Sequence, residues 1–376
     1  MATNRGANPR LKLILFALIG FPHTTAYRIV PQNSWEDALA NRLIAKLCTA
    51  LSVLALLCGG ALAQSKVTIS IGGAGCLCYL PTVLAQQLEE YKKAGIEVEL
   101  VDFKGGSQSL TAVIGGSADV VSGYFDHCVN LAAKNQTLQS FVVYDRYPGL
   151  TLVVAPAQTG KITSVKDLAG KKVGVTAPGS STDFFLKYLL NKDGVDSNSI
   201  GVIGIGIAAT AIAAMEQGSV DAAVMLDPAI TLLQDKYKNL TILSDTRSGP
   251  DTIKVFGGEY PGGALYTKAA WIEAHPKETQ AMTNAILATL KWIHSHSAEE
   301  IMAKMPDNLV GPDKALYLAA LKNTIPMYST TGLMDPNGAQ AVLDVFSQSS
   351  PDVKNAHIDL SKTYTNKFVE QAQGGH

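Results

Sequence analysis

The sequence has little charge of either sign and few of the largest aromatic residues. Charged residues make up 17% of its 376 positions, the 31 basic and 32 acidic residues nearly cancel, and there are only 3 tryptophans. No basic stripe is present, which argues against a nucleic-acid partner. Hydrophobic residues account for 47% of the chain, so a sizeable core is available, and intrinsic disorder or a coiled coil is a poor interpretation.

Motifs of common enzyme classes are also missing. The chain has no Gly-x-Ser-x-Gly elbow, no His-Glu-x-x-His pair and no phosphate-binding P-loop. Residues 204–209 imitate a dinucleotide-binding fingerprint, but no convincing downstream acid supports it, and we expect a tight turn into a helix over residues 208–217. The sequence therefore predicts a protein that is not an enzyme, with no catalytic residues and no cofactor.

The most apolar run near the start, residues 47–57, is shorter than the roughly 20 residues of a membrane span. Arg42 and Lys46 precede it, and Ala61-Leu62-Ala63 closes it. This pattern predicts a secretory signal over residues 43–63, cleaved after Ala63, and export to the periplasm. A buried core helix is the alternative interpretation. We expect residues 1–42 to be a mis-annotated leader extension, with translation starting near Leu43.

Beyond this signal, cysteine is present only at positions 76, 78 and 128. Structural zinc needs four ligands and a wider spacing than Cys76-x-Cys78, and His294-x-His296 is far away in the sequence, so no metal site is predicted. Three thiols permit at most one internal disulfide. Because the two cysteine-bearing loops would lie at the same end of neighbouring strands, we hypothesise a bridge from either Cys76 or Cys78 to Cys128.

From residue 66 onward, strand-like and helical runs alternate. Residues 67–71, 96–101 and 118–122 are typical of strands, and residues 81–93 and 107–114 of helices. This alternation favours mainly parallel sheets with helices on their faces, and hence an α/β fold. Further helices are predicted over residues 184–191, 277–295, 312–322 and 338–347.

The plan then repeats within the chain. Gly116, Ser117 and Asp119 recur at a constant offset as Gly218, Ser219 and Asp221, each time where a helix stops at glycine before a short buried strand. We therefore predict two lobes, the first from residues 66–152 and 256–376 and the second from residues 153–255. Two lobes joined by two passages leave a cleft between them, and such clefts are favoured places for small ligands.

These features resemble the solute-binding proteins of ABC importers, in the nitrate/sulfonate/taurine group that also includes binders of a thiamine pyrimidine precursor. The residues that carry the resemblance are the exported leader, the Gly-rich end of the first strand, Gly116-Ser117-Ala118-Asp119, residues 165–175 and residues 218–223. The resemblance covers residues 66–370. It implies a type II periplasmic-binding-protein clamshell that closes on a small solute and hands it to the permease subunits of a transporter with its ATPase. A monomer is expected.

Candidate ligand contacts lie in the loops that follow the strands, where ligands bind in open α/β lobes. Ser180, Ser181 and Thr182 open one predicted helix, and Gly106 and Ser107 open another. The free N–H groups and the dipole of a helix start attract anions, although ordinary helix capping is the alternative role. The other candidates are one cysteine, four aromatic or imidazole side chains and two acidic residues: Cys76, Tyr79, Tyr124, Phe125, His127, Asp227 and Glu259.

The predicted function is capture of a small organic or inorganic anion, such as a sulfonate, nitrate or a carboxylate, for an ABC importer. Two alternatives stay open: a protein of pyrimidine-precursor binding or synthesis, and a sensory receptor that presents a solute to a kinase. The sequence does not fix the solute, because no arginine or lysine stands at a confident ligand-facing position; Lys104 and Arg146 are candidates only.

Overall fold

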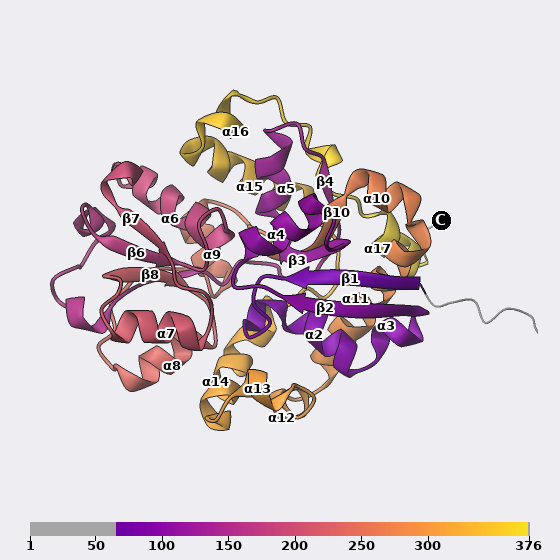
Figure 1. Ribbon diagram of the computed structural model, residues 1–376, viewed down its shortest axis with the longest axis horizontal. Coiled ribbons are helices and arrows are strands. Elements are labelled where there is room, and N and C mark those ends of the chain that lie inside the picture. The colour runs from indigo at the N-terminus through magenta and orange to yellow at the C-terminus, as the bar shows by residue number, and fades with distance from the viewer. Residues whose placement is uncertain (1–64, 375–376) are drawn as a thin grey trace, which may run out of the picture. The chain divides into compact units, whose positions relative to one another are not determined.

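A computed structural model describes residues 65–374 of the chain (Figure 1). The predicted signal and leader extension lie outside the described residues. Within the described range, no helix combines the length and the apolar character that crossing a membrane requires.

Five strands form the first sheet, in the order β2-β1-β3-β10-β4. Strand β1 pairs in parallel with β2 and β3, whereas β10 runs antiparallel to both β3 and β4. Four of the five strands therefore share one direction. Their bounds are β1 Ser65–Ile71, β2 Ile96–Asp102, β3 Val120–Tyr124, β4 Leu138–Val143 and β10 Gly263–Lys268.

The second sheet repeats this topology in the order β7-β6-β8-β5-β9. Strand β6 is parallel to β7 and β8, and β5 is antiparallel to β8 and β9. The predicted α/β fold with two mainly parallel sheets is confirmed. The strand bounds are β5 Thr151–Val154, β6 Lys172–Val175, β7 Gly201–Gly204, β8 Ala222–Met225 and β9 Ile242–Asp245.

Central strand β1 illustrates why these segments form buried strands. Its β-branched residues Val67, Ile69 and Ile71 are each at most 1% exposed. β-Branched side chains suit a pleated strand, and a parallel sheet places its strands under helices on both faces. The apolar residues of β1 therefore pack into the core beneath the helices.

Helices cover the first sheet on both faces, with α4 and α5 on one side and α2, α3 and α11 on the other (Figure 1). Helices α6, α7 and α9 pack on the second sheet, and α8 packs on α7. The bounds are α2 Leu80–Gln87, α3 Glu90–Lys93, α4 Gly106–Gly115, α5 Asp126–Ala132, α6 Ser181–Lys192, α7 Ala209–Glu216, α8 Ala229–Lys236, α9 Gly249–Phe256 and α11 Pro276–Ser295. The remaining helices are α10 Ala269–Ala274, α12 Ala298–Met302, α13 Asp307–Val310, α14 Lys314–Thr324, α15 Pro336–Ser349, α16 Pro351–Asn355 and α17 Lys367–Ala372.

The helix predicted over residues 81–93 is two helices in the structure. Glu89 separates α2 from α3 with a φ of +57°. A left-handed residue of this kind cannot continue a right-handed helix, so the chain turns between the two. The sequence pattern missed this break because glutamate is a good helix former.

The internal repeat has a structural role in both sheets. Gly116 and Gly218 follow α4 and α7 with left-handed φ values of +80° and +68°. The Oδ2 atom of Asp119 then accepts from the backbone N–H of Thr68 at 2.8 Å, and Oδ2 of Asp221 accepts from that of Lys172 at 2.8 Å. Each repeated aspartate thus ties its own strand to the start of the neighbouring strand.

We call residues 65–143 and 263–374, which carry the first sheet, the first lobe, and residues 151–256, which carry the second sheet, the second lobe. Residues 144–150 lead from β4 to β5, and residues 257–262 lead from α9 to β10. Helix α14 also packs on α8, and α15 packs on α6. Helices near the C-terminus therefore contact the second lobe as well as the first.

Candidate functional site

A small inner cavity lies where loops of the two lobes meet. Its accessible space is about 10 Å³, which is the room of about one water molecule. Strand β3 reaches it with its last residue, Tyr124, and the segments after β1, β2, β6, β7 and β8 also contribute to it. Its lining residues are Gly72, Tyr79, Gly106, Tyr124, Leu150, Thr176, Ser180, Ser181, Thr182, Ile207 and Leu226. No lysine or arginine is among them.

Two helix N-termini from opposite lobes converge on this cavity. Helix α4 begins at Gly106 and α6 at Ser181, and neither has a side-chain hydrogen bond that caps it. A Cβ placed on Gly106 would lie 3.9 Å from the Cβ of Ser180. Within residues 65–374, no backbone carbonyl accepts from the first two N–H groups of either helix. Four backbone donors, those of Gly106, Ser107, Ser181 and Thr182, are therefore left free at this point.

The hydroxyl groups before α6 hold their own loop together. The Oγ of Ser180 donates to the carbonyl of Ala177 at 2.7 Å and lies 2.8 Å from Oγ1 of Thr176. Thr182 Oγ1 accepts from the backbone N–H of Thr176 at 2.9 Å. Ser180 and Thr182 were predicted as ligand contacts, and both line the cavity. Their hydroxyls are nevertheless engaged within the loop, so the backbone N–H groups are the donors that a ligand can use.

A buried carboxyl group from the first lobe meets the start of α6. Ser181 Oγ donates to Oδ1 of Asp126 at 2.8 Å, and Tyr260 Oη lies 3.5 Å from Oδ2. Asp126 is 1% exposed. Burial raises the pKa of its carboxyl group to about 7, although the hydrogen bonds from Ser181, the His127 backbone and Tyr260 oppose the rise. The hydrogen bond between Asp126 and Ser181 also joins the two lobes.

His127, a predicted contact, is buried beside the start of α4. Its Nδ1 atom lies 2.6 Å from Tyr266 Oη, and its Nε2 atom has no hydrogen-bond partner in the described part of the chain. A Cβ on Gly106 would lie 3.1 Å from Cε1 of this ring, so a glycine at the helix start lets the ring come close. Burial lowers the pKa of His127 to about 4, and the imidazole is therefore neutral near pH 7.

Two predicted aromatic residues form one wall of the cavity. The rings of Tyr79 and Tyr124 meet edge to face, with centroids 6.1 Å apart. The hydroxyl of Tyr124 donates to the carbonyl of Pro148 in the passage between the lobes. Phe125 is not in the cavity: its ring is fully buried and packs edge to face on Tyr364 at 6.3 Å.

The structure places the remaining predicted contacts elsewhere. Cys76 and Asp227 line a second small cavity beside the first passage, together with Arg247. Oδ1 of Asp227 accepts from the backbone N–H and the hydroxyl of Thr231, so this carboxylate caps α8. Glu259 is exposed and lines neither cavity.

The hypothesis of a bridge to Cys128 is wrong. Cys76 is bonded to Cys78, and Cys128 is a free, buried thiol. A short 3-10 helix, η2 (Leu77–Tyr79), turns the chain directly after Cys76 and brings the two cysteines together. Between them, the backbone N–H of Leu77 donates across the lobes to the carbonyl of Asp227 at 3.0 Å.

Sequence reasoning missed residues that line the cavity or contact its wall. Asp126 was passed over although it lies between the predicted Phe125 and His127, and Ile207 was assigned only to a turn. The side chain of Ile207 packs directly on Gly73 of the other lobe. No sequence pattern signals this contact, because it joins loops more than one hundred residues apart. A carboxylate at a strand end was a usable signal for Asp126.

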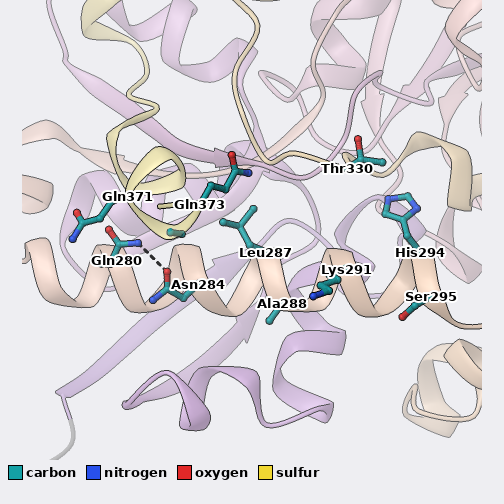
Figure 2. A pocket seen from close by; sticks show the side chains of 11 residues that line it. Gln280, Asn284, Leu287, Ala288, Lys291, His294, Ser295, Thr330, Gln371 and Gln373 are labelled. Atoms are coloured by element: carbon teal, nitrogen blue, oxygen red, sulfur yellow. Dashed lines mark hydrogen bonds between the residues drawn. The ribbon is translucent and has the colours of Figure 1, made fainter. Parts of the chain in front are cut away.

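The structure has larger hollows as well, one of which shares Ile207 with the inner cavity. A groove of about 790 Å³ runs along α11 and the C-terminal helix α17, and Figure 2 shows Gln280, Asn284, Leu287 and Lys291 along one face of α11. Several of its side chains are exposed, and all belong to the first lobe. A second groove, of about 700 Å³, contains Asp102 and Lys104 from one lobe and residues 204–208 from the other. Of these three hollows in residues 65–374, the inner cavity is the one that combines opposed helix ends with buried polar groups.

Comparison with known proteins identifies the family. A family model described as NMT1-like matches residues 62–306. The chain belongs to the NMT1-like family. A solved structure from Bordetella bronchiseptica RB50 is 37% identical, covers 83% of this chain and 98% of its own, and superposes with a TM-score of 0.80.

More distant relatives carry names that describe binding. The nitrate/nitrite binding protein NrtA of Nostoc sp. is 25% identical over 178 residues, which are 46% of this chain and 38% of that protein. The alkanesulfonate-binding protein SsuA of Xanthomonas axonopodis pv. citri, solved with MOPS, shares the fold with a TM-score of 0.62 at 18% identity, over 81% of this chain and 99% of its own. The resemblance to nitrate/sulfonate-type solute-binding proteins is confirmed. These relatives are binding proteins and not enzymes, as the sequence predicted.

Proposed function

We propose that this NMT1-like protein captures a small anion for an ABC importer by closing its two lobes over the solute. The observation that carries the proposal is the convergence of two uncapped helix starts, α4 and α6, on one buried point. Sulfonates, nitrate and small carboxylates are the candidate solutes. The binding activities named for the nitrate- and sulfonate-binding relatives support the same solute class.

The helix starts supply both charge and direction for anion binding. Each N-terminus carries a partial positive charge and points its free N–H groups along the helix axis. Two such ends from opposite lobes give four donors without any cationic side chain. An anion held between them would link the lobes, because each lobe contributes half of the donors. Binding and closure would thus be one event.

The lobes would have to move apart to admit a solute, because the inner cavity is too small for one. Its room of about 10 Å³ is far below the 300–1,000 Å³ or so of ordinary ligand pockets. A solute can reach the helix starts only when the contacts between the lobes separate, among them the Leu77–Asp227 and Ser181–Asp126 hydrogen bonds. The passages at residues 144–150 and 257–262 are the segments that would bend.

Delivery to a transporter belongs to the same proposal. The secretory signal predicted over residues 43–63 places the mature chain in the periplasm, where permease subunits would accept the solute from the closed form. Neighbouring genes test this part. Genes for a permease and an ATPase support import, whereas a lone receptor kinase gene would favour the sensory alternative.

The helix start can be tested by removing a single N–H group. Proline is accepted at the first position of a helix, where it deletes the N–H and keeps the required φ. Ser180 has φ −88° and ψ 170°, the extended conformation that a residue before proline prefers. Ser181→Pro should therefore leave α6 intact while removing one donor. Ser181→Ala is the matched control, because it removes the hydroxyl alone.

Binding is measured by thermal shift and calorimetry with nitrate, methanesulfonate, acetate and a pyrimidine, since a ligand specific for the native state raises the melting temperature. We expect one of the anions to bind. Ser181→Ala should weaken its binding free energy by about 0.5–1.5 kcal/mol, and Ser181→Pro should weaken it by about 1.5–3 kcal/mol. Equal affinities for the two variants would contradict anion binding at the start of α6. Binding of the pyrimidine alone would favour the pyrimidine alternative.

A further inference from the structure

The feature that the anion site leaves unexplained is the carboxyl group of Asp126. It is 1% exposed and lies 2.8 Å from the hydroxyl of Ser181, the first residue of α6 and part of the cavity wall. Its other oxygen lies 3.5 Å from Tyr260 Oη, and the backbone N–H of His127 also donates to the carboxyl group. No lysine or arginine forms an ion pair with it anywhere in residues 65–374. The protein's own carboxyl group thus lies at the helix start that an anion would use.

We propose that Asp126 makes anion capture proton-linked, so that the closed site takes up one anion together with one proton, and that it thereby selects singly charged over doubly charged anions. The proton binds to the Asp126 carboxylate, and the anion binds to the N–H groups of α4 and α6. No covalent bond to the anion forms. This inference rests on the proposed anion-binding function and adds the charge class of the solute.

The physical reason is like-charge repulsion in a site with little water. A carboxylate and a bound anion that share one helix start repel each other, and such a pair is relieved when one member takes up a proton. No cationic side chain of the cavity lining offsets the repulsion, since that lining contains no lysine or arginine. His127 cannot offset it either, because burial lowers the pKa of its ring to about 4. Protonation of Asp126 is the remaining way to remove the second negative charge.

The groups that face Asp126 leave it as the titrating residue near neutral pH. Burial raises the pKa of Asp126 to about 7, whereas burial raises the pKa values of Tyr79, Tyr124, Tyr260 and Tyr266, which stay neutral phenols. On α6, Asp183 is paired with Lys187 at 2.9 Å. Burial also raises the pKa of Asp145, in the first passage. A variant of Asp126 itself is therefore needed to separate the two carboxyl groups.

Charge selection follows from the same arrangement. When Asp126 is protonated, a bound monoanion is the single negative charge of the closed site. A dianion would add a second negative charge, and no cationic side chain of the cavity lining compensates it. Methanesulfonate and sulfate form a suitable pair of probes, because both carry tetrahedral sulfur and neither titrates between pH 6 and 8. We expect methanesulfonate to bind at least tenfold more tightly than sulfate at pH 7.

The test is calorimetry of the full-length chain with methanesulfonate at pH 6, 7 and 8, in two buffers of different ionisation enthalpy. We expect affinity to fall by up to tenfold from pH 7 to pH 8, and the two buffers to report uptake of close to one proton per anion at pH 8. This measurement needs no variant. Binding without proton uptake at pH 8 would overturn the inference while leaving anion capture standing, and no binding of any anion would overturn both.

Asp126→Asn provides the second arm, with Asp193→Asn as the matched control. Asp193 is exposed at the opposite end of α6, so its variant makes the same charge change on the same helix. We expect Asp126→Asn to bind methanesulfonate with no pH dependence and to discriminate less against sulfate, and Asp193→Asn to behave as the wild type. A pH dependence that persists in folded Asp126→Asn, checked by circular dichroism, would assign the proton to another group and refute the proposal.

Discussion

A single methyl group at Gly105 should hold the lobes apart without disturbing either of them. Gly105 precedes α4 in the first lobe with φ −179° and ψ 162°, an extended conformation open to any residue. A Cβ built there would lie 2.9 Å from the Cβ of Ala177 and 3.2 Å from its backbone nitrogen. Both atoms belong to the second lobe. Gly105→Ala therefore introduces a clash that exists only when the lobes are together.

The size of the effect follows from the cost of overpacking. Adding a methyl group to a closely packed contact costs about 1–3 kcal/mol when backbone must shift. If only the closed form bears this cost, solute affinity should fall by about 5- to 150-fold. The free energy of unfolding should change little, because the open form accommodates the alanine without strain.

The assay combines calorimetry with the anion that the thermal-shift screen identifies and small-angle scattering with and without that anion. Gly115→Ala is the control. Gly115 is the last residue of the same helix, and a Cβ built on it has no other atom within 4 Å. We expect Gly105→Ala to bind weakly and to require more anion for compaction, while Gly115→Ala behaves as the wild type. Unchanged affinity in Gly105→Ala would refute the close approach of the two lobes at this point in the bound form.

Three further predictions follow from the described contacts. Non-reducing peptide mapping should find Cys76 linked to Cys78 and Cys128 as a free thiol; a linked Cys128 would contradict the structure. Asp119→Ala and Asp221→Ala should each lower the free energy of unfolding by about 1–3 kcal/mol in urea titrations, because each leaves a strand N–H without its acceptor, and a loss in only one of them would contradict the equivalence of the repeats. Burial lowers the pKa of His127 from 6.5 to about 4, so between these values the unfolded chain binds more protons, and stability due to this group is lost as pH falls. The urea midpoint of His127→Gln should therefore rise relative to that of the wild type between pH 6.5 and pH 4, and a constant difference would show that His127 is not buried in its neutral form.

The candidate site could be predicted only in part. Ser180, Ser181, Thr182, Gly106, Tyr79 and Tyr124 all line the inner cavity, because strand ends and helix starts are visible as patterns and topology brings them together. The role of the serine and threonine hydroxyl groups could not be predicted from the sequence. Serine and threonine before a helix suggest either ligand contacts or loop bonding, and the hydrogen bonds of Thr176, Ser180 and Thr182 within the loop are decided by tertiary geometry.

The sequence by itself determined the α/β plan, the repeated Gly-Ser-x-Asp motif and the positions of the helix starts, since each depends on local periodicity and turn chemistry. Only the tertiary structure decided which residues of the two lobes meet: Asp126 with Ser181, Gly73 with Ile207 and Leu77 with Asp227. It also decided that Cys76 bonds to Cys78 and not to Cys128. Partners of this kind depend on how distant loops or a tight turn place two atoms in space, and the spacing of residues along the chain does not specify that distance.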